Sequence, residues 1–463
     1  MIPERLSGFL DADRTPHQIS QRFIEAGFCL YLVGGSVRDL LLGRDHSDLD
    51  FATDARPDEI LEVVAGWADS TFTVGEAFGT VGVVKRGVTH EITTFRREVY
   101  RDQSRKPRVE FSDDLETDLS RRDFTVNAIA LKLLPHPEII DPYGGLADLH
   151  QGILRTPLGP EISFSDDPLR MLRLFRFMAT LGFEASETAL RAVTRMHGRM
   201  EIVSAERIRD ELSRLLVALK PGAALGAMVA SGLAGEFLPE VAALAAARDP
   251  LQRHKDVLAH TLAVVDKCRP KLELRLAALL HDVGKPETRE FGDGGVTFHH
   301  HEVVGARMAR DRLQELRFKK SEIENVSRLI FLHLRPHTFK MGWTDAAVRR
   351  YVRDAGPLLE DLNELVRCDI TTRNAARARA IQNRIDELEE RIAELRKQEE
   401  LDALRPPIDG NDVMRFLGIP PGPTVGAVLR MLTEYRIEHG PYSKEEAYRL
   451  VQEWSVGSRP TQD

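Results

Sequence analysis

Tyr31-Leu32-Val33-Gly34-Gly35-Ser36-Val37-Arg38-Asp39, followed closely by Asp48-Leu49-Asp50, is the stretch of sequence that decides the fold. An apolar run, a double glycine and then Val-Arg-Asp predict a strand, a tight turn and the start of a helix. Glycine at this place lets backbone N–H groups crowd around a bound phosphate. The turn therefore predicts a triphosphate-binding site, although an ordinary glycine turn is the alternative.

Two carboxylates follow the glycine turn. If residues 48–52 form a strand, Asp48 and Asp50 leave the same face roughly 7 Å apart along it. Carboxylate oxygens at such a spacing suit a pair of Mg²⁺ ions that also bind substrate phosphates. A solvated acidic hairpin is the alternative, but a phosphate turn and a metal pair in this order and this close together favour a catalytic site.

These two motifs together resemble the nucleotidyltransferase head of class II tRNA CCA-adding enzymes and bacterial poly(A) polymerases, which share the DNA polymerase beta-type core. The resemblance implies an α+β fold, with a mixed-sheet head followed by an all-α neck, a helical HD domain and a helical tail. It implies Asp48 and Asp50 as catalytic ligands of two Mg²⁺ ions. It also implies nucleotide-binding roles for Gly34, Gly35 and Arg38.

Length and composition fit a protein of several domains. The chain has 463 residues, 42% of them hydrophobic, and contains no long apolar run, so we expect no membrane segment and no secretion signal. Three widely spaced cysteines fit a reducing cytoplasm. With a net charge of −8, any RNA contact must come from local basic surfaces. We expect a head at 1–153, a neck at 154–245, an HD domain at 246–372 and a tail at 373–463.

The rest of the head carries further candidate residues. Alternating residues over 78–84 and 90–95 predict two paired strands, and Glu91 is either a third acid of the site or a surface acid. The arginine-rich segment 96–108 predicts a loop that touches phosphate, with a solvated loop as the alternative. Two arginines, at positions 121 and 122, precede what reads as an apolar helix, and guanidinium groups suit phosphate oxygens. In the family this motif binds the triphosphate and sugar, and its positions match Arg121, Asp123 and Asn127.

A helix begins near Phe164-Ser165-Asp166-Asp167-Pro168-Leu169-Arg170. The simplest interpretation makes Asp167 a helix cap and Arg170, Arg173 and Arg176 a solvated stripe. However, residues at i and i+3 share a helix face, so Asp167 and Arg170 can present an acceptor beside a forked donor. This pattern matches the pairing edges of cytosine and adenine and not those of guanine or uracil. It also matches the base-reading motif of the family.

Residues 204–216 predict a serine-capped, charged helix that resembles the family's fifth motif. The resemblance implies that Arg207 and Glu211 brace the nucleotide-reading helix as an i,i+4 ion pair. An exposed pair of this kind contributes only about 0.3–0.5 kcal/mol, so stability alone does not account for it.

A second candidate site lies in the next helical region. His260, the adjacent His281-Asp282, His301, His333 and Asp369 follow the order of the HD phosphohydrolase superfamily, which gathers such residues around one or two divalent metals. A buried histidine and aspartate after the apolar helix 276–280 would be costly without a ligand. Sequence leaves open whether the site is catalytic and which phosphoester it takes.

The tail contains Ile385, Leu388, Ile392 and Leu395 at helical spacing, which favours a helical hairpin over a free coiled coil. Two further helices are expected at 424–439 and 443–454. In the family this end holds the tRNA body, and the tail most resembles an actinobacterial-type branch, but packing or dimerisation is an equal alternative. The sequence does not indicate the oligomeric state.

From the residues and the resemblance we predict a cytoplasmic, metal-dependent tRNA nucleotidyltransferase that adds C, C and A, or part of that triplet, to the tRNA 3′ end from CTP and ATP. The alternatives are a poly(A) or A-only polymerase of the same family and a metal-dependent HD phosphohydrolase. A pure binding module is least expected, since it would leave the metal carboxylates and phosphate turn without a task.

Overall fold

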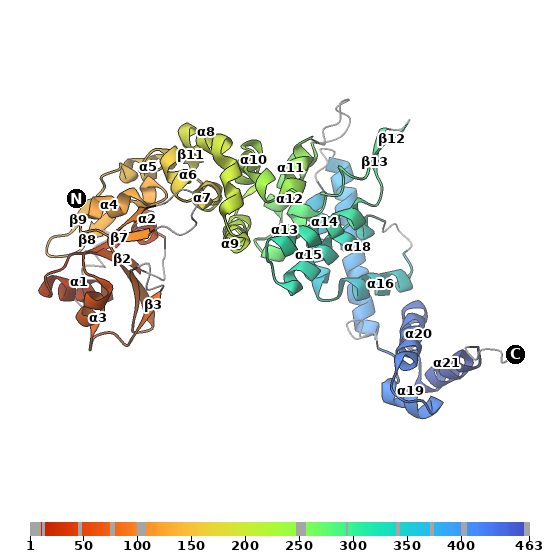
Figure 1. The fold of residues 1–463 in the computed structure, drawn as a ribbon. Coiled ribbons are helices and arrows are strands. Elements are labelled where there is room, and N and C mark those ends of the chain that lie inside the picture. Colours follow the sequence, from red (N-terminus) through yellow and green to blue (C-terminus); the bar gives the residue numbers. More distant parts are fainter. Residues whose placement is uncertain are drawn as a thin grey trace. The chain divides into compact units, whose positions relative to one another are not determined.

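The computed structural model describes residues 11, 14–44, 49–74, 79–99, 108–246, 256–292, 295–338, 343–370, 375–399 and 405–457. The chain forms two compact units, residues 1–242 and 243–463. The first unit contains the sheet and the helices of the predicted neck, and the second is almost entirely helical (Figure 1).

A seven-stranded sheet forms the centre of the head, in the order β3-β4-β5-β2-β1-β8-β9. Strand β2 pairs antiparallel with β1 and parallel with β5. The strands are β1 (Leu30–Val33), β2 (Leu49–Thr53), β3 (Ser70–Val74), β4 (Thr80–Lys85), β5 (Val88–Thr94), β8 (Ala130–Lys132) and β9 (Glu138–Ile140). The predicted strands over 48–52, 78–84 and 90–95 are thus confirmed to within two residues at each end.

The two faces of the sheet carry different layers. Helices α1 (Thr15–Glu25) and α3 (Pro57–Val64) cover one face, where Phe23 and Ile60 pack against the apolar side chains of the strands, including Phe51. The opposite face packs Ala52 and Val33 against residues of α4 (Leu115–Ser120) and the segment that follows it. Because side chains alternate along β2, Asp50 lies on the second face with Ala52.

Smaller elements complete the head, and two of them differ from the predictions. They are α2 (Gly35–Leu41), β6 (Arg96–Val99), β7 (Arg108–Phe111), the 3₁₀ turn η3 (Thr125–Asn127), α5 (Gly145–Gln151) and β10 (Ile153–Leu154). The prediction of a loop over 96–108 is wrong for its first residues and its last, because β6 and β7 are strands that pair antiparallel. Residues 100–107 lie outside the described residues. The apolar helix predicted after Arg122 is also wrong. Residues 125–132 form η3 and strand β8 instead. A short apolar run is typical of both a buried strand and a buried helix, so its pattern does not distinguish them.

The neck is helical except for strand β11 (Glu184–Ala185), which pairs with β10. Helix α7 packs against α9 and α10. The elements are α6 (Pro160–Asp166), α7 (Leu169–Leu181), α8 (Glu187–Met196), η4 (His197–Ile202), α9 (Ala205–Leu216), α10 (Gly222–Ala230), η5 (Leu233–Glu236) and α11 (Pro239–Ala246). Residues 164–166 end α6, and the next helix begins only at Leu169, so Asp167 lies in the junction between two helices.

The second unit begins with a helical bundle and one hairpin. Its elements are α12 (Val257–Lys267), α13 (Leu272–Leu280), β12 (Arg289–Gly292), β13 (Gly295–Phe298), α14 (His301–Glu315), α15 (Lys320–Leu332), η6 (Arg335–Thr338), α16 (Asp345–Ala355), η7 (Gly356–Leu358) and α17 (Leu359–Asp369). The predicted apolar helix before His281 is confirmed as α13, which is buried over most of its length.

Four helices form the tail: α18 (Ala375–Glu399), α19 (Gly410–Leu417), α20 (Pro423–His439) and α21 (Lys444–Gly457). The apolar side chains of α18 at 385, 388, 392 and 395 are buried, and α18 packs against α16 and α17. The last two predicted helices are confirmed as α20 and α21, which form a small core with α19. Among the described residues, no helix combines the length and apolarity needed to cross a membrane.

Candidate active site and candidate metal centre

The glycine turn joins β1 to α2 with a backbone that only glycine adopts easily. Gly34 has φ 72° and ψ −139°, outside the regions that are favourable for other residues. The backbone N–H of Asp50 donates to Ser36 Oγ over 3.1 Å, which fixes strand β2 beside the first turn of α2. A Cβ at Gly34 would lie 2.7 Å from Arg122 Nη1 and 3.9 Å from Asp50 Oδ2. Arg122, Asp50 and the turn therefore share one small volume.

Two carboxylates stand side by side next to this turn. Asp50 and Glu91 are directly opposed across the parallel pair β2–β5, so both side chains leave the same face of the sheet. Asp50 is half-buried and Glu91 is exposed. Asp48 lies outside the described residues. The oxygen donors of Asp50 and Glu91 fit Mg²⁺, which prefers carboxylates and keeps several waters.

We expect Gly34→Ala to raise the KM for the nucleoside triphosphate that this turn is expected to bind at least about 10-fold and to destabilise the protein by about 1–3 kcal/mol. The new methyl group would displace Arg122 and would force a left-handed φ on alanine. Steady-state kinetics and thermal melting measure the two effects. Gly66→Ala is the matched control, because Gly66 has φ +69° but a Cβ added there would meet no atom within 4 Å. Equal KM values for the two variants would contradict the proposed role of the turn.

Asp118 holds the two arginines that the sequence singles out. Arg121 Nη2 lies 2.7 Å from Asp118 Oδ1, and Arg122 Nη2 lies 3.3 Å from Asp118 Oδ2. Burial alone would raise the pKa of Asp118, but the two guanidinium groups outweigh burial and lower it. A single ionised carboxylate thus presents two adjacent cations beside the glycine turn. The sequence pointed to Arg121, whereas the structure places Arg122 against Gly34.

Arg38, Asn127 and Asp123 form a buried relay from α2 to the segment after α4. Arg38 donates from Nη1 to Asn127 Oδ1 over 2.7 Å and forks onto both oxygens of Asp39 at 2.9 and 2.7 Å. Asn127 Nδ2 in turn donates to Asp123 Oδ1 over 2.8 Å. The structure thus brings together three of the predicted nucleotide-binding residues, Arg38, Asn127 and Asp123, which hydrogen-bond to one another.

The relay continues into the neck. Arg173 Nη2 lies 2.9 Å from Asp123 Oδ2. Glu211 of α9 forms ion pairs with two arginines: its Oε2 lies 2.5 Å from Arg176 Nε and its Oε1 lies 3.6 Å from Arg173 Nε. Burial would raise the pKa of Asp123, but Arg173 and the Asn127 hydrogen bond lower it. Burial lowers the pKa of Arg176 to about 10 in spite of Glu211. We call Arg38, Asn127, Asp123, Arg173, Glu211 and Arg176 the head–neck network.

Asp167 and Arg170, the predicted base-reading pair, occupy the start of α7. Asp167 Oδ1 accepts the backbone N–H of Leu169 over 3.1 Å, and Oδ2 accepts from Arg207 Nη2 over 2.8 Å. Arg170 is buried; it donates from Nη1 to Ser163 Oγ over 2.9 Å and from Nη2 to the carbonyl oxygen of Arg121. Asp167 thus binds the first N–H of α7 from the position before the N-cap residue, Pro168, and Arg170 ties α7 to the arginine pair of the head.

Two expectations for the neck are wrong. Arg207 does not pair with Glu211; it binds Asp167, while Glu211 lies between Arg173 and Arg176. The stripe of Arg170, Arg173 and Arg176 is not solvated. Arg170 and Arg173 contact the head, and Arg176 contacts Glu211 of α9. The spacing of three between these arginines was the signal for a shared face. Their sequence alone did not indicate which surface covers that face.

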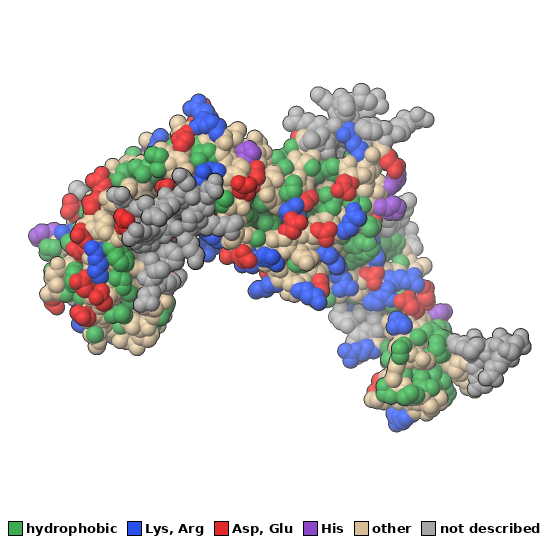
Figure 2. All heavy atoms as spheres, viewed as in Figure 1, with side chains coloured by type: hydrophobic (Ala, Val, Ile, Leu, Met, Phe, Trp, Pro, Cys, Tyr) green, Lys and Arg blue, Asp and Glu red, His purple; other side chains and the backbone are tan. Residues whose placement is uncertain are grey.

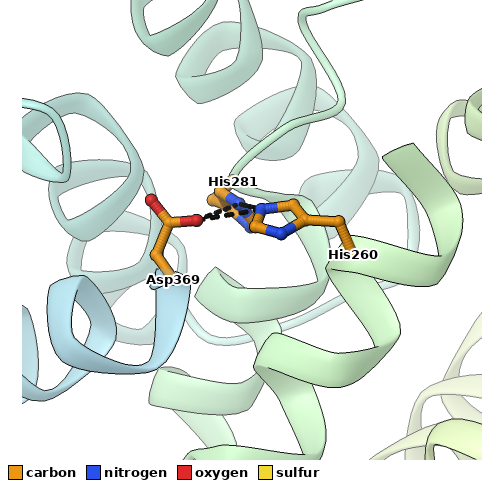
Figure 3. Close-up of side chains that lie close together, drawn as sticks. All are labelled: His260, His281 and Asp369. Atoms are coloured by element: carbon orange, nitrogen blue, oxygen red, sulfur yellow. Dashed lines mark hydrogen bonds and ion pairs between the residues drawn. The ribbon is translucent and has the colours of Figure 1, made fainter. Parts of the chain in front are cut away.

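Six residues from five helices meet in the second unit. His260, His281 and Asp369 form one group and Asp282, His301 and His333 another, each with ligand atoms within 4.8 Å of one another. Figure 3 shows His260, His281 and Asp369 pointing toward one another from α12, the end of α13 and the end of α17. His260 Nε2 lies 2.9 Å from Asp369 Oδ1 and 3.3 Å from His281 Nε2.

Asp282 connects the two groups. Its Oδ2 lies 3.3 Å from His281 Nε2 and 3.4 Å from His260 Nε2, and its Oδ1 lies 3.5 Å from His301 Nε2. Each carboxylate oxygen therefore faces a different group of ligands. This is an arrangement that suits two divalent ions with one shared carboxylate.

Three of the histidines are oriented by the backbone. The Nδ1 atoms of His281, His301 and His333 contact the carbonyl oxygens three residues earlier, at 2.8, 2.9 and 2.6 Å. A carbonyl accepts, so Nδ1 carries the proton and Nε2 offers its lone pair to the cluster, as in metal-binding histidines. His301 Nε2 is buried without a hydrogen-bond partner, which is costly unless a ligand binds it. The residues present fit a divalent metal.

The cluster also perturbs its own ionisation. Burial would lower the pKa of His281, but Asp282 and Asp369 raise it to about 10, so at pH 7 this ring carries a proton on Nε2 as well, which a metal would have to displace. Burial lowers the pKa of His333 to about 3, so this ring is neutral at pH 7. Burial would raise the pKa of Asp282, yet His281 and Lys285 bring it well below its usual value. An ionised carboxylate and a neutral imidazole are the forms that bind metals.

Three known family profiles match consecutive parts of the chain. They are the poly(A) polymerase head domain over residues 30–155, the "Probable RNA and SrmB- binding site of polymerase A" over 182–244 and the HD domain over 257–374.

Relatives match over most of the chain. An A-adding tRNA nucleotidyltransferase of Deinococcus radiodurans is 34% identical over 446 residues, which are 92% of this chain and 95% of the relative. A CC-adding tRNA nucleotidyltransferase of Thermus thermophilus is 34% identical over 92% of this chain and 93% of its own length. The CCA-adding enzyme of Anoxybacillus flavithermus is 41% identical over 46% of this chain and 52% of its own. The crystal structure of the Bacillus stearothermophilus CCA-adding enzyme in complex with CTP superposes with a TM-score of 0.69 at 25% identity, covering 99% of both chains.

Proposed function

The chain belongs to the tRNA nucleotidyltransferase family, and we propose that it adds CMP and AMP, from CTP and ATP, to the 3′ end of tRNA without a nucleic-acid template. One observation carries this proposal. Arg170 of the base-reading pair donates to the carbonyl oxygen of Arg121, and the next residue, Arg122, lies against the Gly34 turn. The segment Arg121–Arg122 therefore contacts both the predicted base-reading pair and the predicted phosphate-binding turn.

Asp48 and Asp50 would hold two Mg²⁺ ions in this proposal. Ions held there would supply Lewis-acid activation of the tRNA 3′-hydroxyl and positive charge opposite the leaving pyrophosphate. The protein's own contribution is positioning. The Gly34-Gly35 turn receives the phosphates, and Arg121 and Arg122 add guanidinium donors on the same side. Glu91, opposite Asp50, is placed to orient the attacking hydroxyl.

The neck selects the base. The Arg170 guanidinium donates to cytosine O2 and N3 while Asp167 accepts from the N4 amine, and a small rotation suits adenine N1 and N6. Guanine and uracil present a donor and an acceptor in the opposite order. Arg207 Nη2 lies 2.8 Å from Asp167 Oδ2 and holds that carboxylate in place from the other side.

Incorporation assays test the proposal directly. We expect a tRNA transcript lacking CCA to gain two residues with CTP alone, and a third when ATP is also present. A transcript ending in CC should gain one A with ATP alone. Gel resolution of labelled products, with transcripts shortened one nucleotide at a time, measures each step. A long A ladder from ATP alone would indicate a poly(A) polymerase, and extension of the CC-ended transcript alone would indicate an A-only enzyme.

We assign the head to residues 1–153, the neck to 154–245, the HD domain to 246–372 and the tail to 373–463, with the tail as a tRNA-holding element. The matched ranges 30–155, 182–244 and 257–374 support the first three boundaries. A tRNA substrate and three unpaired cysteines support a cytoplasmic location.

A second candidate function is favoured by the six-residue cluster of the second unit. We propose that it holds a divalent metal pair and hydrolyses a phosphoester. Two features support metal binding. His301 Nε2 is buried without a hydrogen-bond partner, and the two carboxylate oxygens of Asp282 face different groups of ligands. Bound metal would supply a water of lowered pKa. Lys285, whose Nζ lies 2.6 Å from Asp282 Oδ2, fixes that carboxylate in the ionised form.

A further inference from the structure

An aromatic ring with no assigned role lies at the centre of the head–neck network. Phe177 is on α7, directly after Arg176, and only 4% of it is exposed. Three guanidinium carbons lie over its ring: Arg176 Cζ is 3.9 Å from the ring centre, Arg38 Cζ is 5.2 Å away and Arg173 Cζ is 5.8 Å away. A guanidinium within about 6 Å of the centre is attracted to the face of an aromatic ring. Phe177 therefore contacts cations from both α2 of the head and α7 of the neck.

This gathering of positive charge lies inside the protein. Figure 2 shows Lys and Arg side chains on the visible surface, interspersed with Asp and Glu side chains. By contrast, the side chains of Arg38, Arg173 and Arg176 are only 10%, 33% and 11% exposed. Each of them has a carboxylate partner, but like charges that are this close and this poorly solvated still repel one another. The negative face of the Phe177 ring offsets part of that repulsion.

The ring also closes a circuit of side chains that begins and ends on it. Arg38 donates from Nη1 to Asn127 Oδ1 over 2.7 Å, and Asn127 Nδ2 donates to Asp123 Oδ1 over 2.8 Å. Asp123 Oδ2 lies 2.9 Å from Arg173 Nη2, and the Arg173 guanidinium lies over the same ring as that of Arg38. The positions of Asn127 and Asp123 are thus set from both ends by guanidinium groups that share Phe177.

A second aromatic ring fixes Phe177 from the head. Phe124 is fully buried, and its ring meets that of Phe177 edge-on, with centroids 5.6 Å apart and planes at 87°. The backbone N–H of Phe124 donates to Asp123 Oδ1 over 2.9 Å. Edge-to-face pairs of rings have a preferred geometry, so Phe124 limits how the ring of Phe177 can turn. Both the backbone and the side chains of segment 123–127 are therefore positioned against one ring.

A residue that only fills space would not need these contacts. Phe175, two positions earlier on α7, is completely buried, and no described residue places a guanidinium over its ring. An apolar side chain of similar volume can replace such a residue at modest cost. Shape is not sufficient at Phe177, because the attraction comes from the charge distribution of the ring, which an aliphatic side chain lacks.

We propose that Phe177 is a positioning residue for nucleotide addition, whose aromatic face holds Arg38 and Arg173 so that Asn127 and Asp123 are aligned to receive the incoming nucleotide. The proposal rests on the proposed function, since it takes Asn127 and Asp123 as part of the nucleotide site. Phe177 acts through these side chains and not on the substrate. It fixes them before the nucleotide arrives, so that less order has to be gained during binding and reaction.

The test changes the charge distribution of the ring and leaves its shape nearly unchanged. In the full chain, phenylalanine at position 177 is exchanged for analogues with one, two and three ring fluorine atoms, which withdraw electron density from the face and weaken its attraction for cations. We expect kcat/KM for CTP to fall with each fluorine, by about 10-fold in total, which corresponds to ~1.4 kcal/mol. Steady-state CMP incorporation into a tRNA transcript lacking CCA measures this, and the Kd for tRNA should stay at the wild-type value.

Phe175 is the matched control, because it is buried on the same helix without a guanidinium over its ring. The same analogues at position 175 should leave kcat/KM unchanged. Phe177→Leu should lower kcat/KM at least as much as three fluorine atoms do, whereas Phe175→Leu, which removes the same atoms, should lower chiefly the Tm.

An unchanged kcat/KM across the fluorine series at position 177, or an equal decline at positions 175 and 177, would overturn the proposal. Phe177 would then be a packing residue, and the proposed function would stand if the wild-type protein incorporates CMP. Failure of the wild-type protein to incorporate CMP or AMP would instead count against the proposed function.

Discussion

Asp50→Asn should lower CMP incorporation by about 10³-fold or more, which corresponds to about 4 kcal/mol of lost transition-state stabilisation. The change keeps the shape of the side chain and removes the charge that a metal ion needs. Asp50 is half-buried on β2, opposite Glu91 and beside the Gly34 turn, so the uncharged amide would lie where the metal is expected to bind. Single-turnover incorporation with saturating tRNA measures the effect on the chemical step.

Binding of tRNA should be nearly unchanged in Asp50→Asn, because RNA affinity comes from basic surfaces elsewhere. The control is Asp54→Asn, which removes the same charge just beyond the other end of β2, where Asp54 Oδ1 accepts the N–H of Cys29 over 2.8 Å. An asparagine oxygen can keep that bond. Near-normal incorporation by Asp50→Asn, or an equal loss in Asp54→Asn, would exclude the two-metal account of this head.

His281→Ala should abolish phosphoester hydrolysis and leave CCA addition intact. His281 is fully buried, and its Nε2 faces His260, Asp282 and Asp369. Loss of an outer hydrogen bond to a metal ligand already costs about 10–100-fold in affinity, so loss of a ligand should cost at least that much. Release of product from bis(p-nitrophenyl) phosphate and the content of bound divalent metal are the two measurements.

The two sites should fail independently. Asp50→Asn should keep hydrolysis, and His281→Ala should keep incorporation, so the pair of variants forms a crossed control. His300→Asn is a further control, since His300 is 83% exposed next to His301 and asparagine tolerates its left-handed φ of 60°. Normal metal content in His281→Ala would mean that the cluster does not hold a metal through this histidine.

Sequence determined the local parts of both sites. The sequence suggested a strand over 48–52, and the structure, which has β2 at Leu49–Thr53, places Asp50 and Ala52 on the face away from α1 and α3. The apolar helix before His281 and the charged helix over 204–216 were also predicted, because breakers and periodicity act over a few residues, although the Ser204 side chain makes no capping hydrogen bond. The order of the six HD-type residues along the chain was enough to predict a metal site, although the sequence does not show how close together they lie.

Only the tertiary structure decided which side chains meet. Arg207 binds Asp167, 40 positions away, instead of Glu211 one turn away, because an i,i+4 pair is worth so little that packing of α9 against α7 outweighs it. The choice of Arg122 over Arg121 at the glycine turn depends on how α4 ends beneath the sheet. The contact of Phe177 with Arg38 joins two helices, α7 and α2, which lie far apart in the sequence and which packing brings together. Local pattern therefore fixed the elements and their polar faces, and burial of those elements against one another fixed the partners.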